Sequence, residues 1–315
     1  MTAQTIPPAV STPQAEHPSV LWALWTSLRP YQWTKNTLVF GGLIFSHSLL
    51  NSGALWTSLL AFVWFCCASS GVYLLNDLHD ISEDRLHPTK QFRPIASGAL
   101  NQSVAAVALV TLFLLSIWRG VALQRGFGII LIIYVVLNVS YTLLFKYVVI
   151  LDVLVVAVGF VCRAVAGAVA IGVTASPWLI LCTLMLALLV ACGKRRSELV
   201  LLSDQAANHR KSLKDYSLQF LDLMMSMTGA SVVITYALYT LAPETTTRFR
   251  TSGMVLTTPA VIYGVFRYLY LVHKRREGGD PARLLLKDWP TLINAFLWVG
   301  LVCVILYGPR DWVPW

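Results

Sequence analysis

Residues 54–84 read ALWTSLLAFVWFCCASSGVYLLNDLHDISED, an apolar stretch that runs directly into a cluster of acids. Residues 54–75 contain no charged side chain, and they are long enough to cross the hydrocarbon core of a bilayer, which takes about 20 helical residues. The acids follow at Asp77, Asp80 and Asp84. This stretch therefore predicts a transmembrane helix that carries a polar group of side chains at one membrane surface.

The composition of the whole chain agrees with a membrane protein. Of its 315 residues, 57% are hydrophobic and 12% are charged, and the mean hydropathy is +0.66. Soluble domains carry about a quarter charged residues, so a soluble enzyme, a disordered protein and a disulfide-rich secreted module are all excluded. The six cysteines lie in apolar runs, which argues against disulfides and zinc ligands.

The hydropathy pattern predicts an all-α membrane protein with nine transmembrane helices. The predicted spans are 36–50, 54–75, 103–123, 127–145, 148–172, 177–193, 218–241, 253–272 and 291–308. Residues 1–18 are rich in proline and are expected to be a disordered tail. Residues 19–315 are expected to form a single transmembrane catalytic domain, which opens with a short interfacial helix at 19–31.

The distribution of basic residues predicts the orientation in the membrane. With the N-terminus inside, the cytoplasmic segments hold 17 of the 24 lysines and arginines, and the outer segments hold five. This bias follows the positive-inside rule. We therefore expect a multi-pass protein of the plasma (inner) membrane with a cytoplasmic polar site. The net charge of +9 is ascribed to these loops and to phosphate substrates rather than to nucleic acid.

The acidic cluster is predicted to bind a metal ion. Asn76, Asp80 and Asp84 recur every four residues, and Asp77 joins them, so a continuing helix would place them on one face. Neighbouring carboxylates repel each other unless a cation neutralises them. Oxygen ligands select a hard ion such as Mg²⁺, which usually shares its coordination sphere with substrate phosphates. The alternative is a solvated acidic helix end whose acids pair with Arg85 and Lys90.

The loop after the acids adds positive charge. It contains Lys90 and Arg93, and Pro88 and Pro94 are expected to end any helix there. A metal ion together with a guanidinium and an ammonium group would form a clamp for a diphosphate. For Lys90 alone, plain positive-inside charge is an alternative explanation.

Residues 76–98, NDLHDISEDRLHPTKQFRPIASG, resemble the first aspartate-rich motif of the UbiA superfamily of intramembrane prenyltransferases. The resemblance implies a helical bundle that binds magnesium and a diphosphate at its mouth. The catalytic residues that it implies are Asp77, Asp80, Asp84 and Arg85. The magnesium ligands that it implies are Asn76, Asp77, Asp80 and Asp84.

A second polar segment distinguishes between branches of that superfamily. Aromatic prenyltransferases carry a second DxxxD motif after the sixth span, whereas residues 194–198 read KRRSE here. Together with RPYQWTKN at 29–36, this resembles the branch that transfers 5-phosphoribose from 5-phosphoribosyl 1-diphosphate to a polyprenyl (decaprenyl) phosphate, making a precursor for the cell-wall arabinan. The further substrate-binding candidates are Lys35, Lys90, Arg93, Tyr141, Lys146, Lys194, Arg195 and Glu198.

Several alternatives stay open at this point. An aromatic prenyltransferase is the second candidate function, and a transporter is a third. Asp152 and Arg163 lie in a predicted span, where charged side chains are costly, and each is compatible with either a structural or a functional role. Association into a homo-oligomer is also left open.

Overall fold

The computed structural model describes residues 19–202, 211–275 and 287–308, and its ordered elements there are all helices. The residues predicted to be a disordered tail, 1–18, lie outside the described part. The helices are α1 Val20–Leu28, η1 Pro30–Phe40, α2 Gly41–Phe45, α3 Ser52–His79, α4 Ile81–Leu86, η2 Lys90–Phe92, α5 Gln102–Leu123, α6 Arg125–Leu143, η3 Phe145–Tyr147, α7 Leu151–Ala170, α8 Pro177–Leu202, η5 Lys211–Asp215, α10 Leu218–Leu241, α11 Pro243–Phe249, η6 Gly253–Thr257, α12 Thr258–Tyr270, η7 Leu271–Arg275 and α14 Trp289–Tyr307.

The predicted all-α membrane fold is confirmed. Eight helical segments in the described residues are long and apolar enough to cross a membrane, and they coincide with eight of the nine predicted spans. The count of nine is not confirmed, because the predicted span 36–50 falls on the 3₁₀-helix η1 and the short α2. A 3₁₀-helix rises about 2.0 Å per residue, so the eleven residues of η1 alone extend about 22 Å.

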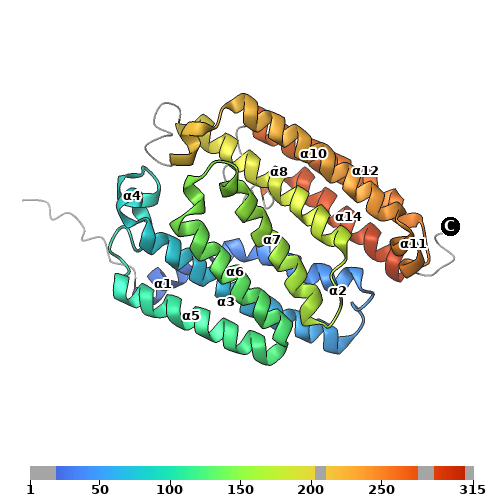
Figure 1. The fold of residues 1–315 in the computed structure, drawn as a ribbon, viewed down its shortest axis with the longest axis horizontal. Coiled ribbons are helices and arrows are strands. Elements are labelled where there is room, and N and C mark those ends of the chain that lie inside the picture. Colours follow the sequence, from blue (N-terminus) through green and yellow to red (C-terminus); the bar gives the residue numbers. More distant parts are fainter. Residues whose placement is uncertain (1–18, 203–210, 276–286, 309–315) are drawn as a thin grey trace, which may run out of the picture.

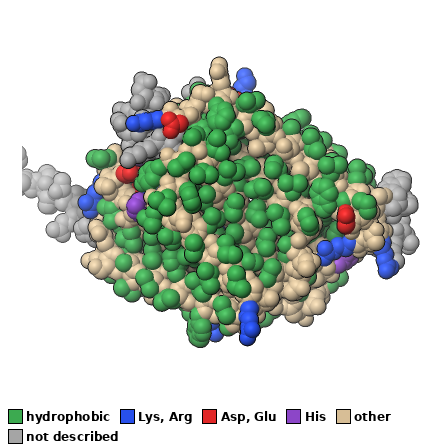
Figure 2. All heavy atoms as spheres, viewed as in Figure 1, with side chains coloured by type: hydrophobic (Ala, Val, Ile, Leu, Met, Phe, Trp, Pro, Cys, Tyr) green, Lys and Arg blue, Asp and Glu red, His purple; other side chains and the backbone are tan. Residues whose placement is uncertain are grey.

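Helices that follow each other along the chain lie side by side (Figure 1). The first half groups α3, α5, α6 and α7 around a core that includes Phe65, Phe127 and Leu131, and the second half groups α8, α10, α12 and α14. Helices α7 and α8 join the two halves. Figure 2 shows a broad hydrophobic surface with the charged side chains toward its edges, as lipid contact requires.

The first segment packs unusually close to α7. A Cβ atom on Gly167 would lie 1.8 Å from the carbonyl oxygen of Val39 in η1, and one on Gly42 would lie 2.6 Å from the Cα atom of Ala168. Small residues let helix backbones approach to this distance inside a membrane. This contact fixes η1 against the bundle and thereby places Arg29, at its start, beside the end of α3.

We expect Gly167→Ala to destabilise the fold by about 1 to 3 kcal/mol, because the added methyl group overlaps the Val39 carbonyl and the two segments must separate. Gly300→Ala is the matched control, since a Cβ atom there meets nothing within 4 Å. Thermal unfolding of both variants in detergent measures the difference. A Gly167→Ala protein as stable as Gly300→Ala would show that the close approach is absent.

Candidate active site

The acids lie at the junction between α3 and α4. Helix α3 ends at His79, Asp80 is its C-cap, and α4 begins at Ile81. The helical hydrogen bonds continue across this junction, since the Asp80 amide donates to the Asn76 carbonyl at 2.9 Å and the Asp84 amide to the Asp80 carbonyl at 2.8 Å. Asn76, Asp80 and Asp84 therefore stay on successive turns, as the sequence predicted.

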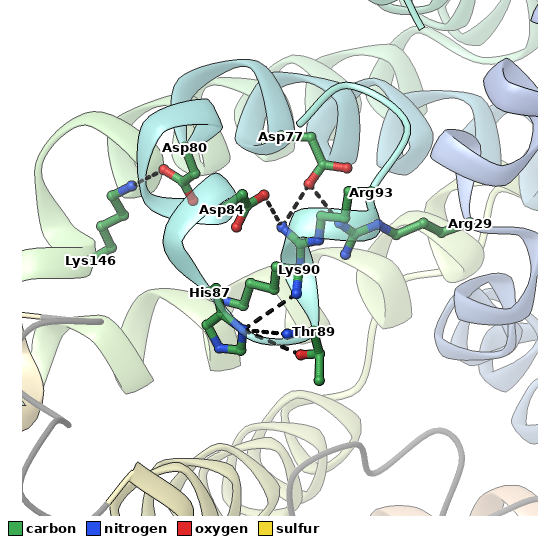
Figure 3. A network of polar contacts seen from close by, with 9 residues as sticks. All are labelled: Arg29, Asp77, Asp80, Asp84, His87, Thr89, Lys90, Arg93 and Lys146. Atoms are coloured by element: carbon green, nitrogen blue, oxygen red, sulfur yellow. Dashed lines mark hydrogen bonds and ion pairs between the residues drawn. The ribbon is translucent and has the colours of Figure 1, made fainter. Parts of the chain in front are cut away.

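Two arginines neutralise the buried acids of this group (Figure 3). The Oδ1 atom of Asp77 accepts from Arg29 at 2.6 Å and from Arg93 at 3.0 Å, and Arg93 also donates to Asp84 at 2.6 Å. The side chains of both acids are only 3% exposed. Arg93 thus joins α3 to α4 through its guanidinium, a planar group with several fixed donors.

Asp80 points the other way, toward η3, and accepts from the ammonium group of Lys146 (Figure 3). Its side chain is 25% exposed, more than those of Asp77 and Asp84. One turn back along α3, the amide oxygen of Asn76 accepts from the Thr142 hydroxyl of α6. The predicted candidate Lys146 is therefore brought into the acidic group, and Asp80 is the acid most open to a ligand.

Burial shifts the pKa values of the ionisable groups here. Burial raises the pKa of the Asp84 carboxyl, although Arg93 opposes the shift. Burial and the charge of Arg93 lower the pKa of Lys90, whereas the charges of Asp84 and Glu198 raise it. The pKa of Lys146 is raised, because its bond to Asp80 outweighs the effect of burial. Both the acids of α3 and α4 and Glu198 of α8 therefore act on the charge of Lys90.

The second polar segment, residues 194–198, was predicted to follow the sixth span as a loop, but it lies within α8, which continues to Leu202. Glu198 accepts from Arg195 and lies 3.9 Å from the Lys194 ammonium. Arg195 is 3% exposed, and its Nε atom lies 3.7 Å from Asp152 of α7. The buried Asp152 in turn accepts from the Tyr216 hydroxyl at 2.7 Å. All three candidates in this segment therefore belong to one ionic cluster.

The other candidates lie at the edges of this region. The Nε atom of Arg85 donates to the Ala96 carbonyl at 3.0 Å, so this exposed side chain ties α4 to the following loop. Tyr141 is half-buried near the end of α6. Lys35 is half-buried in η1, six residues beyond Arg29 and so about 12 Å further along the helix at 2.0 Å per residue.

Arg163, whose role the sequence left open, is a structural residue at mid-helix. It donates to the Asn36 side chain at 2.8 Å, to the Gly159 carbonyl at 2.7 Å and to the Tyr134 hydroxyl at 2.8 Å. Its guanidinium also lies 4.9 Å from the centre of the Tyr134 ring. These bonds satisfy a charge that would otherwise be costly within the membrane, and they hold η1 against α6 and α7.

Sequence reasoning missed three residues that complete this region: Arg29, Thr142 and Tyr216. Each lies 48 to 66 residues from the acid or amide that it contacts. No local pattern pairs them with their partners. Only a covariation signal between distant positions could have done so.

A Mg²⁺ site built from protein side chains alone is not present in the described residues, where no group of three or more His, Cys, Asp or Glu side chains could hold a metal ion. The acids are instead shared with Arg29, Arg93 and Lys146. This arrangement fits magnesium in its usual protein form, in which one or two carboxylates hold the ion and substrate phosphates complete its coordination.

Comparison with known proteins identifies the family. The sequence matches the UbiA prenyltransferase family over residues 37–300. The chain belongs to this family. The resemblance inferred from residues 76–98 is therefore confirmed, and the protein is an integral membrane enzyme of the UbiA type.

Two curated relatives carry the same name. A decaprenyl-phosphate phosphoribosyltransferase of Corynebacterium glutamicum is 34% identical, covering 89% of this chain and 86% of that protein. One of Mycolicibacterium smegmatis is 30% identical, covering 89% and 91%. Among solved structures, a UbiA homolog from Archaeoglobus fulgidus bound to GPP and Mg²⁺ has a TM-score of 0.71 at 18% identity, covering 90% of this chain and 99% of that one. At this identity the structural likeness establishes the UbiA fold.

Proposed function

We propose that this enzyme transfers 5-phosphoribose from 5-phosphoribosyl 1-diphosphate to a polyprenyl phosphate such as decaprenyl phosphate, and releases diphosphate. Two relatives named decaprenyl-phosphate phosphoribosyltransferase, at 34% and 30% identity, support this reading. The product would then serve as a precursor of the cell-wall arabinan. The reaction would take place in the single transmembrane domain of residues 19–315, at the cytoplasmic face of the plasma membrane.

The observation that carries the proposal is the basic character of the second polar segment. Lys194 and Arg195 both engage Glu198 near the end of α8. The charges of Asp84 and Glu198 both act on Lys90. A phosphoribosyl diphosphate has a 5-phosphate in addition to its diphosphate, and the acceptor lipid has another phosphate. Basic side chains match this extra negative charge, whereas a second acidic motif would repel it.

Asp80 and Asp84 are the proposed carboxylate ligands of Mg²⁺, with the Asn76 amide oxygen beside them. Asp80 is more exposed than Asp77 and Asp84, and the amide oxygen of Asn76 keeps a second lone pair beyond its bond to Thr142. Asp77, buried under two arginines, would position Arg29 and Arg93. When bound, Mg²⁺ would neutralise charge on the diphosphate.

The reaction needs charge stabilisation more than proton transfer. The bond between the ribose C1 atom and the diphosphate oxygen breaks with its electron pair leaving on the diphosphate, and a phosphate oxygen of the lipid forms the new bond to C1. Arg93 and Lys90 would stabilise the leaving diphosphate. A phosphate monoester is already largely ionised near pH 7, since its second pKa is about 6, so no general base is required.

Transfer can be tested with purified protein in nanodiscs that contain polyprenyl phosphate. With Mg²⁺ and radiolabelled 5-phosphoribosyl 1-diphosphate, we expect label to enter the lipid. Adding EDTA should stop the transfer, and excess Mg²⁺ should restore it, because the acids share the ion with the diphosphate. Parallel reactions offer a prenyl diphosphate and an aromatic acceptor. A prenylated aromatic product without labelled lipid would contradict the proposal, and activity that EDTA does not change would contradict the metal site.

A further inference from the structure

The hydroxyl group of Tyr216 joins the two halves of the candidate site. Tyr216 follows η5 and is 5% exposed. Its oxygen accepts from the Ile150 amide at 2.8 Å and donates to Asp152 Oδ1 at 2.7 Å. One buried hydroxyl therefore binds both the turn between η3 and α7 and the first turn of α7, from a position more than 60 residues away in the sequence.

The turn that Tyr216 holds is strained. Ile150 has a φ of 71°, a left-handed conformation that a β-branched residue rarely adopts. Such a conformation persists only where the surrounding structure enforces it. The bond from the Ile150 amide to Tyr216 is one such constraint. The same connection carries Lys146 in η3, four residues earlier, which bonds to Asp80.

The other bond of Tyr216 leads to α8. Asp152 is fully buried, and its Oδ2 atom lies 3.7 Å from the Nε atom of Arg195. The buried Nε–H group of Arg195 donates to no hydrogen-bond acceptor within the described residues. Arg195 in turn donates to Glu198. A shift of Asp152 would therefore move the guanidinium that orients Glu198, while a shift of Ile150 would move Lys146.

We propose that Tyr216 and Asp152 are positioning residues that set the Lys146–Asp80 pair and the Arg195–Glu198 pair at the spacing needed to hold one phosphorylated donor between them. This inference rests on the proposed function for the identity of the donor. The positioning role does not depend on that identity and calls only for a ligand that carries a diphosphate. Neither residue needs to touch the substrate for this role.

Tyr216→Phe tests the inference, because it removes the hydroxyl and keeps the ring. We expect the KM for the ribosyl donor to rise about tenfold while kcat changes less than about twofold, the pattern for a loss of uniform substrate binding. The affinity for inorganic diphosphate with Mg²⁺, measured by calorimetry, should fall by a similar factor. Hydrogen exchange of a peptide covering residues 145–154 should become faster.

Tyr307→Phe is the matched control. Its hydroxyl also accepts from a backbone amide, that of Leu49, and donates to a backbone oxygen, that of Ile44, but it ties α14 to α2, away from the acids. This variant should lose stability without a change in KM or in diphosphate affinity. Equal effects of the two variants on diphosphate affinity would overturn the inference, as would unchanged affinity and exchange in Tyr216→Phe.

If Tyr216→Phe does not fold, Asp152→Asn tests the part of the inference that leads to α8. It keeps an oxygen acceptor for Tyr216 and removes the charge that faces Arg195, so diphosphate affinity should fall while exchange at residues 145–154 stays slow. Unchanged affinity for diphosphate in this variant would contradict the proposed role of the contact between Asp152 and Arg195. Failure of the wild-type protein to transfer phosphoribose, with diphosphate affinity still sensitive to Tyr216, would reject the proposed function and leave the positioning role standing.

Discussion

Asp80→Ala is expected to lower phosphoribosyl transfer by about a thousandfold while the protein still folds. Asp80 has the most exposed carboxylate of the group and is held by Lys146. Its loss would remove a proposed metal ligand and leave Lys146 unoriented, so the leaving diphosphate would lose charge stabilisation worth several kcal/mol. Initial rates with radiolabelled donor in nanodiscs measure the effect.

Glu83→Gln is the matched control for this variant. Glu83 lies on α4, three residues beyond Asp80, and its side chain is exposed. Removing its charge tests whether general negative charge near the site matters, and we expect activity within about twofold of wild type, as for most exposed substitutions. Full activity in Asp80→Ala would contradict the proposed metal site. Equal losses in both variants would show that only the summed charge of the segment is needed.

Arg93→Ala should have the largest effect on stability, a loss of about 3 to 5 kcal/mol, together with loss of transfer. Arg93 bonds to both Asp77 and Asp84, whose side chains are 3% exposed. Removing one partner of a buried ion pair leaves an uncompensated charge, which is the costly case. Burial already raises the pKa of Asp84, and without Arg93 we expect this pKa to rise further.

Thermal unfolding in detergent at several pH values checks this prediction. An Asp84 pKa raised in the folded protein means that folding favours the protonated form, so the Arg93→Ala protein should regain stability as the pH falls from 7 toward 5. Arg125→Ala is the control, because Arg125 is exposed at the start of α6. An Arg93→Ala protein as stable as Arg125→Ala at pH 7 would mean that the acids have other partners.

Much of this architecture follows from local sequence patterns. Each transmembrane helix needs only a long apolar run, so eight of the nine predicted spans coincide with helices in the structure. The exception is the segment from 36 to 50, which falls on η1 and α2. In η1, Trp33 and Asn36 bond to the side chains of Ser70 and Ser69 of α3. These contacts, together with the bond between Asn36 and Arg163, accompany a 3₁₀ conformation that hydropathy alone cannot indicate.

The same local reasoning predicted the position of the acids but not their charge partners. Helical spacing placed Asn76, Asp80 and Asp84 on successive turns, and mutual repulsion implied that cations must neutralise the acids. Which cations do so could not be predicted, because Arg29 is 48 residues from Asp77 and Lys146 is 66 from Asp80. An ion pair between distant segments depends on how whole helices pack, and no period in the sequence encodes it.

The chain alone therefore determined the membrane helices, the acidic end of α3 and the basic end of α8, because hydrophobic length and helical periodicity act over a few turns. Tertiary packing decided that Arg93 bridges two acids and that Asp152 lies between Tyr216 and Arg195. The physical reason is that a buried charge must find its partner in three dimensions, wherever that partner lies along the chain.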